Sequence, residues 1–235
     1  PEGYFFDPSL RPGIIGTQGY WDDLVYHWHS RGRQLSIHCN GVGAIETFIT
    51  AVERAQARCP RKDARHLIIH CQMATDEHVR RMKEAGILPS FYGLHVWNWG
   101  DRHRDIFLGP DRAARLDPAG SAVRAGLPFS LHADTPVLPQ MTMLSIHTAV
   151  NRETKGGAVL GPDQRISTLE AVRAYTSYAA LFSHSETWRG TIEPGKVADF
   201  VIPSEDILEA PAGRLKGITF AAAIVDNRVV YGQLP

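Results

Sequence analysis

The sequence contains little cysteine: Cys39, Cys59 and Cys71 are the three among 235 residues. An odd number of cysteines at these separations neither forms a paired disulfide framework nor matches a zinc knuckle. Two of them directly follow histidines at the ends of predicted strands, where a small thiol packs well. We therefore predict reduced core cysteines in a cytoplasmic protein, because disulfides persist in oxidising compartments.

The sequence also has no net charge and no long apolar run. Its 25 basic residues balance 25 acidic ones, so there is no electrostatic reason to expect nucleic acid or an anionic membrane as a partner. No apolar run approaches the roughly 20 residues that cross a bilayer. Residues 1–4 show neither the basic start nor the apolar core of a signal peptide. These absences predict a protein that binds neither nucleic acid nor membrane.

Short apolar runs alternate with helical patterns through the first 182 residues. Strands are expected over 34–39, 66–71, 87–92 and 127–132. Helices are expected over 20–31, 43–58, 75–86, 139–150 and 168–182, with two short ones over 111–125. Such alternation is typical of a parallel α/β architecture.

The pattern changes to short strands near the C-terminus. Residues 197–202, 218–225 and 228–231 read as strands, the last two forming a hairpin that turns at Asp226 and Asn227. Only four parallel strands precede them, whereas a closed eight-stranded barrel needs about 250 residues. The number of strands therefore predicts half of a TIM-like barrel. Either the first half lies on another polypeptide, or this chain is a fragment.

Three of the predicted strands end in residues that bind metals. His38 and His70 each close an aliphatic strand, and Asp134 follows a third. In a parallel barrel the carboxyl ends of the strands meet at one mouth of the barrel. Burying an unpaired carboxylate there would destabilise the protein. Two imidazoles and a carboxylate there predict a divalent metal site.

The pair His27 and His29 is a poor metal-binding candidate. It lies within a helical segment, where positions two apart point about 200° apart and cannot share a metal. We predict a surface or packing role for this pair. The remaining histidines sit in polar or mid-helix contexts and are expected to face solvent or cap helices: His66, His78, His103, His147 and His184.

Further candidates lie at the same mouth. His95 follows the strand over 87–92 within an aromatic loop that would either contact substrate or pack on itself. His132 precedes Asp134 by two residues, so strand alternation places both on one face, where His132 could support the site by a hydrogen bond.

These segments resemble the amidohydrolase superfamily, and most of all its family-three branch, the metal-dependent hydrolases related to N-substituted formamide deformylase. Residues 37–41, 69–72 and 131–137, which contain His38, His70 and Asp134, resemble the branch's strand-five, strand-six and strand-eight motifs. Val42 stands where the branch usually has aspartate. The tail adds three matches, at 165–176, 190–201 and 225–231.

The resemblance implies an α/β fold that is the C-terminal half of a TIM-like (β/α)8 barrel followed by part of a small β-sandwich domain. The barrel half would occupy 1–185 and the sandwich part 186–235. The family's earlier metal ligands would come from the missing N-terminal half, a necessary partner. A homo-oligomer is left open.

The resemblance also implies a hydrolase that attacks a non-peptide, amide-like C–N bond of a small molecule with a metal-activated water. One or two divalent ions, zinc by preference, would be held by His38, His70 and Asp134. Asp134 would act as general base and acid. His95 would steady the oxyanion or orient the substrate, and Tyr92, Trp97 and Trp99 would form an apolar wall.

Two alternatives stay open. The chain could be a non-catalytic fragment or half-barrel that only binds a partner, since two histidines alone would hold a metal weakly. The barrel could otherwise act on lactones or phosphoesters, because the loops that set specificity have partners outside this chain.

Overall fold

A four-stranded parallel sheet forms the centre of the computed structural model, which describes residues 2–234. Its strands are β1 (Ser36–Cys39), β2 (His66–His70), β3 (Ile87–Tyr92) and β4 (Ser130–His132), and they pair in that order. Cys39 pairs with His70, His70 with Phe91, and Tyr92 with His132. The carboxyl ends of all four strands therefore meet at one edge, as the sequence predicts.

Two amphipathic helices connect the first three strands. α2 (Val42–Arg58) buries one apolar face that includes Phe48, Ile49 and Val52. α3 (Asp76–Ala85) begins at Thr75, whose side chain accepts a hydrogen bond from the His78 amide, and ends at Gly86. Gly86 has a φ of +69°, a left-handed conformation that glycine adopts without strain. These boundaries confirm the helices expected over 43–58 and 75–86.

Further helices surround this unit, and the structure sets their bounds. They are α1 (Gln18–His29), the π-helices η1 (His95–Trp99) and η2 (His103–Phe107), α4 (Gly100–Arg102), α5 (Pro110–Ala113), α6 (Ala119–Ala125), α7 (Thr142–Asn151), the 3-10 helix η3 (Pro162–Gln164), α8 (Thr168–Tyr175), α9 (Ser177–Phe182) and the 3-10 helix η4 (Ala212–Gly217).

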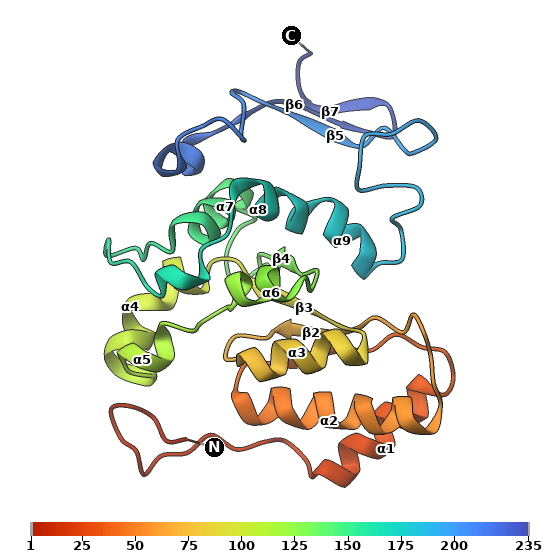
Figure 1. The fold of residues 1–235 in the computed structure, drawn as a ribbon. Coiled ribbons are helices and arrows are strands. Elements are labelled where there is room, and N and C mark those ends of the chain that lie inside the picture. Colours follow the sequence, from red (N-terminus) through yellow and green to blue (C-terminus); the bar gives the residue numbers. More distant parts are fainter. Residues whose placement is uncertain (1, 235) are drawn as a thin grey trace.

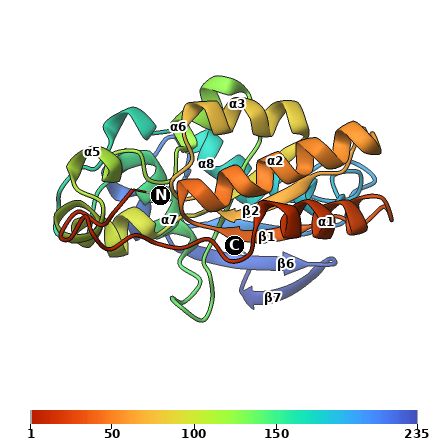
Figure 2. The ribbon, with the colours of Figure 1, turned by 90° about the horizontal axis from the view of Figure 1, so that it is seen from below.

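The elements stack in layers around the parallel sheet. α1, α2 and α3 lie on one side of it, and α7, α8 and α9 lie on the other (Figure 1). A single apolar core joins both sides, because Phe48, Ile68, Phe129 and Ala171 belong to one buried cluster. Figure 2 shows the helical layer of α2 and α3 lying along the sheet.

A separate antiparallel sheet lies beyond α7–α9 and is formed by β5 (Phe200–Pro203), β6 (Phe220–Val225) and β7 (Arg228–Gly232) (Figure 1). The hairpin turn at Asp226 and Asn227 is confirmed, with φ values of +48° and +60°. Two left-handed residues in a two-residue turn match the twist of the strands they join.

Four expectations about elements need correction. The first expected strand begins at Ser36 rather than at residue 34, and the fourth is confined to Ser130–His132. The helix expected over 168–182 is divided at Thr176, whose ψ of −97° interrupts the helical backbone. The aromatic loop expected after the strand over 87–92 contains η1, α4 and η2.

Candidate metal centre

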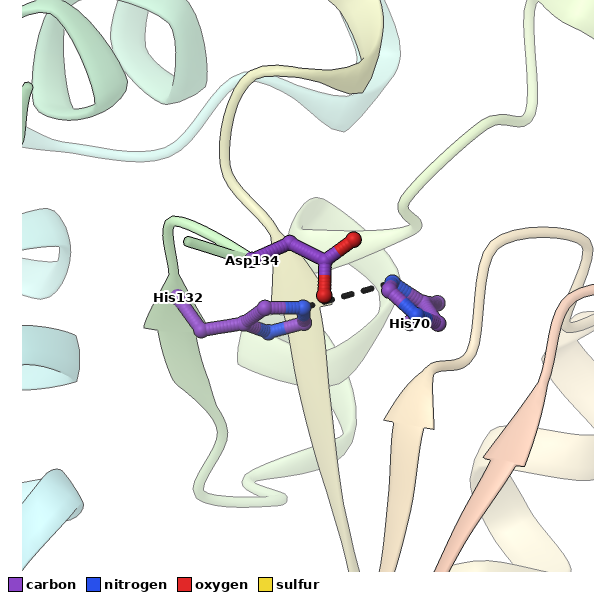
Figure 3. A group of neighbouring side chains, drawn as sticks. All are labelled: His70, His132 and Asp134. Atoms are coloured by element: carbon purple, nitrogen blue, oxygen red, sulfur yellow. Dashed lines mark hydrogen bonds between the residues drawn. The ribbon is translucent and has the colours of Figure 1, made fainter. Parts of the chain in front are cut away.

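Two of the strand ends bring together three side chains of the types that bind metals. His70 closes β2, His132 closes β4, and Asp134 follows two residues later. One nitrogen from each ring and one carboxylate oxygen all lie within 4.8 Å of one another. Figure 3 shows the three side chains converging, with a hydrogen bond of 3.3 Å between Nε2 of His132 and Nδ1 of His70.

Two serines fix the His132 ring. Ser90, on β3, is hydrogen-bonded to Nδ1 of His132 at 2.9 Å, and Ser130 donates to Ser90 at 2.8 Å. Holding Nδ1 directs the other ring nitrogen, Nε2, toward His70 and Asp134. Hydrogen bonds of this kind orient the imidazole ligands of metal sites.

The electrostatic environment keeps both imidazoles neutral. Burial is the main cause that lowers the pKa of His132 to about 4, with the neighbouring His70 ring next. Burial also lowers the pKa of His70, and the His95 and His38 rings act in the same direction. A neutral imidazole has a free lone pair, which is the form that binds a metal. The donor set of two imidazoles and a carboxylate therefore fits a divalent cation.

His38 lies beside this group rather than inside it. Its ring centroid is 4.5 Å from that of His70, in an edge-to-face arrangement. The residue is exposed on β1, the first strand of the sheet, and Asn40 is near its Nε2 at 3.5 Å. The structure thus places His38 next to the three converging side chains, on the open side of the sheet.

A buried pair lies next to the centre, formed by His95, a candidate from the sequence, and Asp117, which sequence reasoning missed. His95, in η1, contacts His70 with ring centroids 5.7 Å apart, and its Nδ1 lies 2.8 Å from Oδ1 of Asp117. Both side chains are 8% exposed. Because a carboxylate only accepts hydrogen bonds, Nδ1 of His95 carries a proton, and in the neutral ring Nε2 is an acceptor.

The backbone around Asp117 is held by a buried arginine. Arg152, 2% exposed, donates through Nη2 to the Leu116 carbonyl at 2.7 Å and through Nε to the Leu160 carbonyl at 2.9 Å. The Asp117 amide in turn donates to the Gln72 carbonyl, just after β2. Burial lowers the pKa of Arg152 to about 10, so the guanidinium stays charged at neutral pH. These contacts fix Asp117, and through it His95.

The expected aromatic wall divides into two parts. Tyr92 is buried among the rings of His70, His95 and His132, at centroid distances of 6.3, 4.6 and 5.8 Å. Burial raises its pKa to about 12, and Asp134 and Asp117 add to the rise. Trp97 and Trp99 are half-buried and lie further along η1: Trp97 stacks edge-on against His147, and Trp99 lies under the guanidinium of Arg102.

The remaining histidines correct several expectations. His66 and His147 are buried, not solvent-facing, at 0% and 1% exposure. His147 contacts Glu153 at 3.0 Å. His103 is half-buried against Gln72, whereas His184 is exposed as expected. His78 confirms the capping role, since its ring accepts from the Thr75 amide.

The pair His27 and His29 does lie in a helix, α1, as expected. His29 is buried and packs against His66, with 2.8 Å between Nδ1 of His29 and Nε2 of His66. His27 is exposed. The prediction of a surface or packing role is therefore confirmed for both.

Two further observations concern the whole chain. Cys39, Cys59 and Cys71 are free thiols, and the first and last are buried, as predicted. Among residues 2–234, none of the helices combines the length and apolar character needed to cross a bilayer.

The fold is that of solved metal-dependent hydrolases. An uncharacterized metal-dependent hydrolase from Pyrococcus horikoshii OT3 superposes with a TM-score of 0.75 at 22% identity, over 90% of this chain and 42% of the other. An uncharacterized metal-dependent hydrolase from Pyrococcus furiosus superposes with a TM-score of 0.69 at 21% identity, over 83% of this chain and 38% of the other.

The sequence matches the amidohydrolase family (Amidohydro_3) over residues 4–231, and the chain belongs to that family. N-substituted formamide deformylase of Arthrobacter pascens is 31% identical over 89% of this chain and 38% of its own length. Protein LONG AFTER FAR-RED 3 of Arabidopsis thaliana is 30% identical over 74% of this chain and 30% of its own length. The chain spans less than half the length of the curated relatives it matches.

Proposed function

We propose that this chain is the C-terminal half of a metal-dependent hydrolase, with residues 1–185 forming half of a TIM-like barrel and residues 186–235 part of a β-sandwich. Four parallel strands in sequence order, joined by helices, support the half-barrel. The antiparallel sheet β5–β7 supports the sandwich part. The N-terminal half would lie beside β1 and β4, outside this chain.

The observation that carries the function is the convergence of His70, His132 and Asp134 within 4.8 Å. We propose that His70 and Asp134 hold one or two divalent ions, preferably zinc, together with His38. His132, which the structure adds, either completes this set or orients it through its contact with His70. When bound, such a cation lowers the pKa of a water ligand toward about 7 and polarises a carbonyl.

The side chains around the cation would carry the proton transfers. Asp134 takes a proton from the attacking water and returns it to the leaving nitrogen. His95, held by Asp117, contacts the substrate and either steadies its oxygen or orients the scissile group. One side of the substrate is lined by Tyr92, Trp97 and Trp99.

The proposed substrate is a small molecule with a non-peptide, amide-like C–N bond. The relative from Arthrobacter pascens is named for deformylation of N-substituted formamides, which breaks such a bond. Lactone or phosphoester hydrolysis is the alternative within the same architecture. We also propose a cytoplasmic location, on the free thiols.

The test uses the complete enzyme to which this chain is proposed to belong. Metal content is measured by emission spectroscopy, and turnover is measured on amides, N-substituted formamides, lactones and phosphotriesters. We expect bound zinc and turnover of formamides or amides, and loss of both in His70→Ala. The matched control is His184→Ala, an exposed histidine outside the centre.

Three results would contradict the proposal. Absence of a stoichiometric metal, with no hydrolysis of any substrate, would favour a half-barrel that only binds a partner. Turnover restricted to lactones or phosphotriesters would favour the alternative chemistry. Full metal content in His70→Ala would remove the proposed site.

A further inference from the structure

The hydroxyl of Tyr92 is a buried polar group at the centre that the resting protein does not use. Tyr92 closes β3 and is 2% exposed. Its Oη is buried and has no hydrogen-bond partner among residues 2–234. A buried hydroxyl without a partner destabilises the protein, and such groups are uncommon in folded proteins. An unpartnered hydroxyl therefore points to a partner that arrives with a ligand.

The surroundings of Tyr92 show which ligand this is. Its ring lies face-to-edge on His95 at 4.6 Å and stacks near His132 at 5.8 Å. His70 is edge-on at 6.3 Å. The Tyr92 ring thus packs among the imidazoles proposed to bind the metal and the substrate, which points to the substrate as the partner of its hydroxyl.

The other groups of the centre mostly accept hydrogen bonds. Asp134 is a carboxylate, and in neutral His95 the contact of Nδ1 with Asp117 makes Nε2 an acceptor. Water addition to a carbonyl moves negative charge onto the carbonyl oxygen, which then needs a donor. A tyrosine hydroxyl is protonated at neutral pH and can donate. His95 was proposed either to steady the substrate oxygen or to orient the scissile group. A ring whose Nε2 accepts hydrogen bonds suits the second of these tasks.

We propose that Tyr92 is a catalytic residue that donates a hydrogen bond from Oη to the reacting oxygen of the substrate. As the water oxygen bonds to the carbonyl carbon, the π electrons move to the oxygen facing Tyr92 and the water proton goes to Asp134. The carbonyl then re-forms, the C–N bond breaks with its electron pair on nitrogen, and Asp134 returns the proton there. Tyr92 keeps its own proton throughout. This inference rests on the proposed hydrolase function.

The experiment replaces Tyr92 with Phe in the complete enzyme, which removes only the hydroxyl. We expect kcat to fall about 10²–10³-fold, as when other oxyanion donors are removed, while KM and zinc content stay close to wild type. We also expect weaker binding of inorganic phosphate, a tetrahedral oxyanion, measured by calorimetry on the zinc-loaded protein. The matched control is Tyr178→Phe, whose hydroxyl donates to Glu170 on α8 at 3.0 Å, outside the centre.

A stability measurement separates catalysis from structure. Because the Tyr92 hydroxyl has no partner in the resting protein, Tyr92→Phe should leave the melting temperature of the ligand-free enzyme unchanged or raise it. A clear drop would show that the hydroxyl has a structural partner and would overturn the inference. Unchanged kcat in Tyr92→Phe, with an active parent enzyme, would also overturn it. A parent enzyme inactive on every substrate would instead overturn the proposed function.

Discussion

At the scale of single residues, the account depends most on Asp134. Its φ of +54° turns the backbone directly after β4 and brings the carboxylate beside His70 and His132. In the complete enzyme, Asp134→Asn keeps the shape and an oxygen that can touch the cation but loses the basic carboxylate. We expect kcat to fall by about 10²–10⁴-fold, the usual contribution of a general base.

Metal content, measured alongside turnover, shows whether the loss comes from proton transfer or from an empty site. The matched control is Asp111→Asn, an exposed aspartate in the first turn of α5. Near-normal turnover of Asp134→Asn with the metal retained would remove its role as the base.

Asp117 gives a second prediction at this scale. An asparagine there can donate its amide N–H to Nδ1 of His95 and so favour the opposite tautomer, which disrupts a catalytic imidazole. We expect Asp117→Asn to lower kcat by about 10²-fold, because a misplaced His95 no longer orients the substrate. The ¹⁵N chemical shifts of the His95 ring would report the exchange of tautomers. Unchanged shifts and unchanged kcat would show that Asp117 only fills space.

At the scale of elements, the histidine pair between α1 and β2 links folding to pH. The Leu35 amide donates to Nδ1 of His66, so in the neutral ring Nε2 carries the proton and donates to His29 Nδ1 at 2.8 Å. His29 Nε2 then donates to the Cys59 carbonyl. Protonation of His66 would break the first bond of this series. Burial lowers the pKa of His66 to about 4, and the His29 and Arg61 charges add to the shift.

The sign of the pH dependence follows from this lowered pKa. Unfolded His66 takes up a proton near its ordinary pKa of 6.5, whereas folded His66 does so only near 4. Its contribution to stability is therefore complete above pH 6.5 and is lost as the pH falls from 6.5 to 4, by about 2–3 kcal/mol. Urea unfolding of His66→Gln should show a flatter pH dependence in this window.

The exposed His27, on the same helix, supplies the control variant His27→Gln. The free energy of unfolding of His27→Gln should have the same pH dependence as that of the parent protein. A pH dependence of His66→Gln equal to that of the parent would show that the buried pair does not couple protonation to folding.

The elements also show what the sequence could predict. The aliphatic strands deliver His70 and Asp134 to one edge because parallel pairing aligns their ends, and the local pattern contains that information. Asp117 gives no such signal, because it lies between the short helices α5 and α6 and is placed beside His95 by tertiary contacts such as its amide bond to the Gln72 carbonyl. The burial of His66 and His147 is likewise tertiary, because it depends on His29 of α1 packing on His66 and on Glu153 contacting His147.

At the scale of the whole molecule, the parallel sheet has open edges. Within residues 2–234, β1 and β4 each pair with one neighbour only, and His38 is exposed on β1. Open strand edges promote association between chains. We predict that residues 1–235 produced alone self-associate in size-exclusion chromatography with light scattering, whereas co-production with the preceding half of the barrel gives a discrete species. A monodisperse monomer of residues 1–235 would contradict the half-barrel proposal.

The most direct test of the metal centre is anomalous diffraction at the zinc edge from crystals of the complete enzyme. The account predicts a peak within about 2.0–2.3 Å of an imidazole nitrogen of His70 and a carboxylate oxygen of Asp134, with His38 or His132 beside it. A peak elsewhere, or the Asp134 carboxylate turned away from both imidazoles, would contradict it.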